Sequence, residues 1–161
     1  AETLGSDIPF CVLVQNTSYR CACGTGRGEE LHALRRGLRK YLVLAKPAFG
    51  VSTREVFAGI DACEIPTHPD LAQLKRALRQ RDDEIVYQNM INVLENYTLP
   101  HYPRVRALKD RIAATDGVRK VLMSGSGPTV IGFYDSYRMA KQACTEIRKA
   151  GFEAYWADTI R

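Results

Sequence analysis

The most informative part of the sequence is Met123-Ser124-Gly125-Ser126-Gly127-Pro128-Thr129-Val130. It lies between two short apolar runs, 118–122 and 131–134, each with the length of a β-strand. Gly125 and Gly127 allow the backbone to adopt positive φ angles or to approach a ligand closely. Successive free N–H groups in such a loop can form an anion-binding nest, although a glycine-rich hairpin without a ligand has the same spacing. The stretch therefore predicts two strands joined by a loop that is a candidate phosphate site.

Hydrophobic spacing and capping residues on both sides of this loop predict alternating strands and helices. Predicted strands cover 10–14, 41–45, 118–122, 130–133 and 152–157, and 15–25 is expected to be irregular. Five helices are predicted, and their starts are Ser52 or Thr53, Asp70, Asp82 or Asp83, Pro103, and Ser136. The third of these helices is expected to include Val93 and Leu94. From residue 40 the order is strand, several helices, two strands, helix, strand, which predicts an α+β fold with helices on one open sheet.

Composition is that of a globular protein with one ordinary core. The chain has 161 residues, of which 45% are hydrophobic and 25% charged. No apolar run approaches the roughly 20 residues that span a bilayer, and the start shows no signal-peptide pattern. The net charge of +5 suits an anionic substrate, but also nucleic acid or a soluble surface. The basic cluster Arg35, Arg36, Arg39 and Lys40 is interpreted as a solvated turn before a strand rather than as a binding patch.

The cysteines favour reduced thiols and a cytoplasmic location. There are five of them, an odd number without the spacing of a disulfide framework. Cys21 and Cys23 form a Cys-x-Cys pair, but a metal site needs two more ligands and the sequence has no second pair. The histidines His32, His68 and His101 are isolated from one another. No metal site is therefore predicted.

Further motifs occur in a fixed order before the glycine-rich loop. They are Leu4-Gly5-Ser6-Asp7-Ile8-Pro9-Phe10, Gly26-Arg27-Gly28-Glu29, Leu44-Ala45-Lys46-Pro47 and Val51-Ser52-Thr53-Arg54-Glu55-Val56-Phe57. Together with the loop they resemble the GHMP kinase superfamily over nearly the whole chain. The loop by itself does not choose a substrate. The segments 89–95 and 102–109 are similar to those members that phosphorylate 4-diphosphocytidyl-2-C-methyl-D-erythritol.

The resemblance implies a kinase that uses ATP and Mg²⁺ to phosphorylate the 2-hydroxyl of that cytidine-diphosphate substrate, a step toward isoprenoid precursors. It implies a ferredoxin-like GHMP kinase C-terminal domain at 39–161, preceded at 1–38 by a remnant of the N-terminal domain. Members also have a longer N-terminal part with a catalytic-site lysine and a loop for the ATP phosphates. We therefore expect the C-terminal portion of a kinase, inactive by itself. We expect no nucleic acid or membrane partner, and leave a homodimer open.

The resemblance also carries over individual site residues. Asp7, in its Gly-Ser-Asp-Ile-Pro-Phe setting, matches the catalytic aspartate, which takes or orients the proton of the acceptor hydroxyl; a turn aspartate is the alternative. Phe57 matches an aromatic that stacks on the cytosine ring, with a core phenylalanine as the alternative. Thr53 is a weaker candidate in the same pocket, with a helix cap as its alternative.

The phosphate-proximal loop consists of Ser124, Gly125, Ser126 and Gly127, with Ser126 and Gly127 as first choices. Lys46 could reach an anion, although a lysine at a strand end is more often solvated. The chain departs from the family at 14–23, where relatives have a shorter turn with glycines. A tight hairpin usually requires glycine or asparagine, so this departure puts the local strand pairing and the placement of Asp7 in question.

Two other functions remain open at this point. One is another GHMP kinase acting on a small alcohol, against which the segments 89–95 and 102–109 argue. The other is a free-standing ferredoxin-like RNA-binding module, which would account for the positive charge. Such a module presents exposed aromatics on its sheet, whereas the strand 130–133 offers only Phe133, with Tyr134 on the opposite face.

Overall fold

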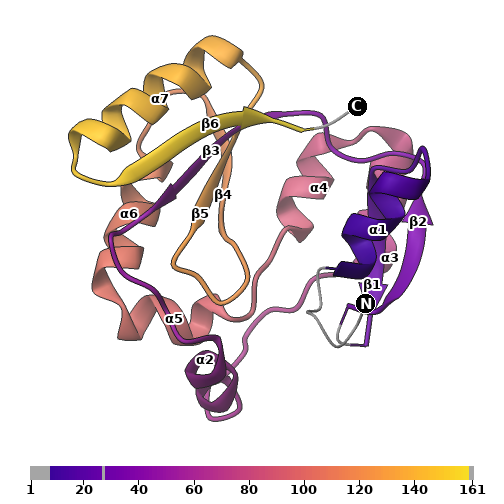
Figure 1. Cartoon of the computed structure of the whole chain (residues 1–161), viewed down its shortest axis with the longest axis horizontal. Helices are drawn as coiled ribbons and strands as arrows, with labels where there is room; N and C mark the ends of the chain where they lie inside the picture. The colour runs from indigo at the N-terminus through magenta and orange to yellow at the C-terminus, as the bar shows by residue number, and fades with distance from the viewer. Residues whose placement is uncertain (1–7, 27, 160–161) are drawn as a thin grey trace.

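The computed structural model describes residues 8–26 and 28–159. Asp7, the predicted catalytic residue, lies outside these residues. In chain order the elements are α1 (Ile8–Asn16), β1 (Cys21–Thr25), β2 (Glu30–Leu34), β3 (Tyr41–Lys46), α2 (Thr53–Ile60), α3 (Leu71–Gln80), α4 (Asp83–Asn89), α5 (Glu95–His101), α6 (Pro103–Ala113), β4 (Val118–Met123), β5 (Val130–Tyr134), α7 (Tyr137–Lys149) and β6 (Glu153–Asp158) (Figure 1). None of the helices described is long and apolar enough to cross a membrane.

Four strands form the main sheet, in the order β4-β5-β3-β6 with every neighbouring pair antiparallel. In the register, Val43 at the centre of β3 lies opposite Gly132 of β5 and Trp156 of β6. Strand order and connections are those of a ferredoxin-like α+β domain, so the predicted fold class is confirmed. Strands β1 and β2 form a separate two-stranded antiparallel sheet.

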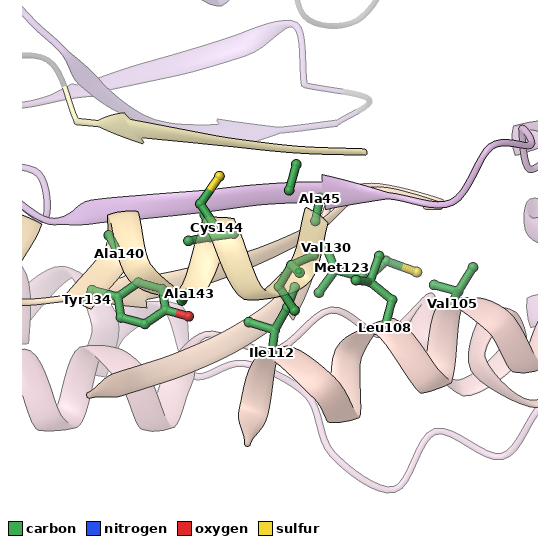
Figure 2. Close-up of a cluster of buried hydrophobic side chains, with 13 residues drawn as sticks. Ala45, Val105, Leu108, Ile112, Met123, Val130, Tyr134, Ala140, Ala143 and Cys144 are labelled. Atoms are coloured by element: carbon green, nitrogen blue, oxygen red, sulfur yellow. The ribbon is translucent and has the colours of Figure 1, made fainter. Parts of the chain in front are cut away.

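The hydrophobic core lies between one face of the main sheet and the helices α6 and α7 (Figure 2). It collects alternate residues of the strands and one stripe of each helix, as the two periodicities require. Its buried members include Val43, Ala45, Val130, Tyr134, Val105, Leu108, Ile112, Ala140, Ala143, Cys144 and Ile147. At Gly132 a Cβ would come within 2.7 Å of the Ile112 side chain, so the absent side chain allows α6 to pack closely on β5.

Side-chain caps set the starts of four helices, as the sequence predicts. Ser52, Asp70, Asp82 and Ser136 each accept a hydrogen bond from the backbone N–H three residues ahead. This satisfies one of the unpaired amides at each N-terminus.

The predicted extension of α4 to Leu94 is wrong, because α4 ends at Asn89. The Asn89 carboxamide accepts from the Asp70 N–H and donates to the Gln73 side chain and the Ile85 carbonyl. These bonds tie the end of α4 to the start of α3. The chain then turns, and the separate helix α5 begins at Glu95, with Pro100 inside it.

Two predictions for the N-terminal region are also wrong. The run 10–14, predicted to be a strand, lies in α1, and β1 lies within 15–25, predicted to be irregular. A five-residue apolar run is too short for its periodicity to separate helix from strand. Local hydrogen bonds favour the helix here: the Arg20 guanidinium donates to the Val14 and Thr17 carbonyls near its C-terminal end.

Lys40 is not part of a solvated turn, contrary to the interpretation of the basic cluster. Its ammonium group is nearly buried and pairs with Asp83 of α4 and Asp135 after β5. Burial by itself would lower the pKa of Lys40, but the hydrogen bonds from its ammonium group to Asp135 and Asp83 outweigh this and hold the pKa above its ordinary range. The residue thus fixes the start of β3 to two other elements.

Candidate functional site

The glycine-rich loop between β4 and β5 is closed by its own backbone. The Ser124 N–H donates to the Thr129 carbonyl at 2.8 Å, and the Gly127 N–H donates to the Ser124 carbonyl at 2.9 Å. The N–H groups of Gly125 and Ser126 donate to no other group in the described part of the chain. Two adjacent amides therefore remain available to an anion.

Both glycines of the loop have positive φ, +54° at Gly125 and +88° at Gly127. At Gly127 a Cβ would also meet the Met123 sulfur at 2.9 Å. At Gly125 a Cβ would have nothing within 4 Å among the described residues. The backbone is thus packed on the Gly127 side and open on the Gly125 side, where a ligand could approach it.

The helix α2 contributes a hydroxyl to the loop. The Thr53 Oγ1 lies 2.8 Å from the Ser126 Oγ, a hydrogen bond between residues 73 positions apart. The cap of α2 is Ser52, whose side chain accepts from the Glu55 N–H. The cap alternative for Thr53 is therefore wrong, and the structure brings two predicted site residues together (Figure 1 shows the loop end beside α2 and α5).

Phe57 follows Thr53 by four residues on α2, so both side chains lie on the same side of the helix. Phe57 is 56% exposed, whereas Val56 and Ile60 supply the buried face of α2. The alternative of a core phenylalanine is therefore wrong for this chain. An exposed aromatic ring lies on the same helix face as the hydroxyl that contacts the glycine-rich loop.

Three further residues, which the sequence did not single out, also hold the loop. The Asn92 amide donates to the Met123 and Gly125 carbonyls, both at 2.8 Å. Glu95 accepts from the Met123 N–H at 2.7 Å, and Thr98 donates to the Ser126 carbonyl at 3.2 Å. Asn92 and Glu95 lie in the segment 89–95, which carried part of the resemblance. That was the available signal, but the partners lie about thirty residues later and no local spacing indicates them.

The helices α2 and α5 are fixed to each other at this site. The Tyr97 and Tyr102 hydroxyls both donate to the Glu55 carboxylate, at 3.3 and 3.0 Å. Partial desolvation and the Glu55 charge raise the pKa of both phenols, so they stay protonated as donors. A Cβ at Gly59 would come within 2.0 Å of the Tyr97 ring, so this close packing requires glycine.

The remaining candidates do not join this site. Lys46 forms an ion pair with Glu153 of β6, with its Nζ 3.3 Å from the Glu153 Oε2. The anion-binding alternative for Lys46 finds no support in this pairing. Within 8–26 and 28–159, no group of three or more His, Cys, Asp or Glu side chains is placed to hold a metal ion.

Comparisons with known proteins give one family and a set of relatives. The family model described as "GHMP kinases C terminal" matches residues 60–153. A protein of Brevibacillus brevis named 4-diphosphocytidyl-2-C-methyl-D-erythritol kinase is 43% identical over 79% of this chain and 41% of its own length. A protein of Clostridium acetobutylicum with the same name is 38% identical over 98% of this chain and 54% of its own length. The chain spans about half the length of these curated relatives.

Solved structures give the same picture. A crystal structure of 4-(cytidine 5'-diphospho)-2C-methyl-D-erythritol kinase is similar with a TM-score of 0.76 and 26% identity, over 98% of this chain and 54% of that one. A homoserine kinase from Cytophaga hutchinsonii is similar with a TM-score of 0.60 and 16% identity, over 81% of this chain and 44% of that one. The second likeness concerns the fold alone.

Proposed function

Because the chain belongs to the GHMP kinase family through its C-terminal domain, we propose that it is part of a kinase that phosphorylates 4-diphosphocytidyl-2-C-methyl-D-erythritol. The γ-phosphate of ATP would be transferred to the 2-hydroxyl of this substrate. The observation that supports the proposal most is the contact of Thr53 with Ser126, which brings the Phe57 helix to the glycine-rich loop. The relatives named for this substrate support the choice of acceptor.

Each site residue has a role in this proposal. The exposed Phe57 ring stacks on the cytosine, an interaction of about 1–3 kcal/mol for base–aromatic contacts. The free N–H groups of Gly125 and Ser126 bind phosphate oxygens or stabilise the charge that develops during transfer. Asp7, which lies outside the described residues, takes or orients the proton of the acceptor hydroxyl.

The phosphate donor and its metal belong to the proposal as well. ATP and Mg²⁺ are expected in the whole enzyme. The described residues offer no cluster of three or more His, Cys, Asp or Glu side chains for a metal ion. A cytoplasmic location stays a prediction, and a homodimer stays open. By itself, this chain is expected to show no turnover of the cytidine-diphosphate substrate.

The RNA-binding alternative receives little support from the sheet. Phe133 is buried and packs against Tyr87 of α4 at a ring distance of 6.5 Å, and Tyr134 is buried in the core. On the sheet face away from α6 and α7, Tyr155 is the aromatic that stays exposed among the described residues. An RNA-binding sheet of this kind stacks about two or three bases on exposed aromatic rings, and one exposed ring is too few for this.

The proposal is tested in a protein that joins this chain to the N-terminal half of the Clostridium acetobutylicum relative. Phe57→Ala should raise KM for the cytidine substrate about tenfold or more and change kcat less, because stacking is common to the ground and transition states. Tyr155→Ala is the matched control, since Tyr155 is equally exposed but lies on β6. Equal KM values for Phe57→Ala and the control would contradict the assignment of Phe57.

Asp7→Asn tests the catalytic assignment in the same joined protein. Asn keeps the shape but cannot accept the proton, so kcat should fall about 10²-fold or more while substrate binding changes little. A near-normal kcat would make Asp7 a turn residue. If the unmodified joined protein turns over another small alcohol faster than the cytidine-diphosphate substrate, the substrate assignment itself is wrong.

A further inference from the structure

A pocket lies between β2 and α3, away from the glycine-rich loop, which lies beside α2 and α5 (Figure 1). Its volume is about 460 Å³, within the range of roughly 300–1,000 Å³ that small-molecule sites occupy. Its described lining has two chemically different parts. One part is apolar, from Ala33, Leu34 and Leu78, and the other is cationic, from Arg35, Arg36, Lys75 and Arg79.

The cationic part gathers four positive charges from two separate segments. Arg35 and Arg36 directly follow β2, and Lys75 and Arg79 lie one turn apart on the same side of α3. None of the described lining residues is acidic. The tertiary structure thus joins half of the basic cluster seen in the sequence to a second pair of cations.

These four side chains lack partners in the part of the chain that the structure describes: none donates a hydrogen bond or forms an ion pair there. By contrast Lys40, Lys46, Lys109 and Arg119 all pair with carboxylates. Arg35, Arg36 and Arg79 are exposed and Lys75 is partly buried. Like charges that line one pocket repel, and a bound anion reduces this repulsion. Arginine side chains also offer forked donors that match phosphate oxygens.

We infer that this pocket binds a small organic phosphate or diphosphate, with its charged group held by Arg35, Arg36, Lys75 and Arg79 and its apolar part against Leu34 and Leu78. The size of the pocket and its apolar lining favour a small molecule over a free inorganic ion. The pocket shares no residue with the candidate kinase site. The inference therefore goes beyond the proposed function and does not depend on it.

The test is calorimetric titration of the complete 161-residue chain at fixed ionic strength, with ADP and with inorganic diphosphate as probes. ADP should bind more tightly, because its adenosine part contacts the apolar lining. Arg36→Gln/Arg79→Gln should weaken ADP binding about tenfold or more through lost charge-assisted hydrogen bonds. The matched control is Arg106→Gln/Arg138→Gln, two exposed arginines on α6 and α7. It removes the same charge elsewhere and should change binding by less than about twofold.

Leu78→Ala distinguishes the contribution of the apolar lining to binding from that of the cationic lining. It should weaken ADP binding and leave inorganic diphosphate unchanged, with circular dichroism as the check that the variant is folded. Binding of neither probe to the unmodified chain overturns the inference. The inference is also overturned if the control pair loses as much ADP affinity as Arg36→Gln/Arg79→Gln. It is overturned as well if ADP shifts the NMR signals of Gly125 and Ser126 and not those of Leu34 and Leu78. A single-stranded RNA that displaces ADP and binds more tightly would replace the small-molecule site by a nucleic-acid surface.

Discussion

Regular helices and strands are present both in 8–34, as α1, β1 and β2, and in 41–158, but these two segments bury their side chains very differently. Every buried residue among those described lies between Val43 and Ala154. In α1, β1 and β2 no described side chain is buried, and Phe10 and Val12 are 36% and 46% exposed. Regular hydrogen bonding is therefore present in both segments, whereas a packed core is present in one.

The difference separates two sources of order. The second segment gains stability from apolar surface removed from water, at about 25 cal/mol per Å². The first relies on backbone ladders and caps, such as the Arg20 bonds to the Val14 carbonyl in α1 and to the Thr17 carbonyl just after it. An isolated two-stranded hairpin is marginal in water. We therefore expect the difference in local stability between the two segments to be larger than the change in stability caused by any single substitution.

Hydrogen exchange should show the largest effect. Amides of α1 and β1 should open with free energies near zero, about 0–1 kcal/mol, whereas those of β3 and β5 should approach the global value of about 5–15 kcal/mol. The measurement is exchange followed by NMR on the chain at a concentration where it is monomeric. Slow exchange of the amide hydrogens of 11–14 in such a monomer would contradict the predicted difference in local stability between the two segments.

A matched pair of core and surface truncations gives the next largest effect. Leu108→Ala removes a fully buried side chain of α6 and should lower the free energy of unfolding by about 2–5 kcal/mol. Val12→Ala in α1 should change it by no more than about 0.5 kcal/mol, because Val12 is largely exposed. Urea unfolding with a constant m-value measures both. A large effect of Val12→Ala would place α1 in the same cooperative unit as the core.

Asn92→Ala tests whether the order of the glycine-rich loop depends on its hydrogen bonds to the Asn92 side chain. The substitution removes donors to the Met123 and Gly125 carbonyls and an acceptor for the Leu94 N–H, so about 1–3 kcal/mol should be lost. Amides at 124–129 should then exchange faster. Asn96→Ala is the control, since among the described residues its side chain donates to the nearby Val93 carbonyl and not to the loop. Equal exchange in both variants would mean that the loop is ordered without Asn92.

The smallest effect is expected from the contact between α2 and the loop. Thr53→Val and Ser126→Ala each remove one side of a hydroxyl pair, and their coupling energy in a double-mutant cycle should be about 1 kcal/mol. The unfolding free energies of both single variants and the double variant provide the measurement. A coupling near zero would show that α2 is held to the rest of the site through Glu55 and the two tyrosines instead.

Local chemistry explains which parts of the fold the sequence predicts well. The caps Ser52, Asp70, Asp82 and Ser136 are in place, and the strands that flank the glycine-rich loop are β4 and β5. Both signals act within a few residues, through an N-terminal amide or the alternation of a strand. The helix α1 and the end of α4 were missed. The first is an apolar run without a decisive period, and the second depends on a contact of Asn89 with α3.

The candidate site also has features that local sequence patterns predict and features that they do not. Local sequence patterns were enough to identify the glycine-rich loop, the helix that carries Thr53 and Phe57, and the family to which these motifs belong. The folded structure was needed to show that Thr53 contacts Ser126, that Asn92, Glu95 and Thr98 hold the loop, and that four cations share one pocket. The physical reason is range: caps and periodicities act between near neighbours, whereas these contacts join residues tens of positions apart, which only the packing of the sheet and helices brings within hydrogen-bonding distance.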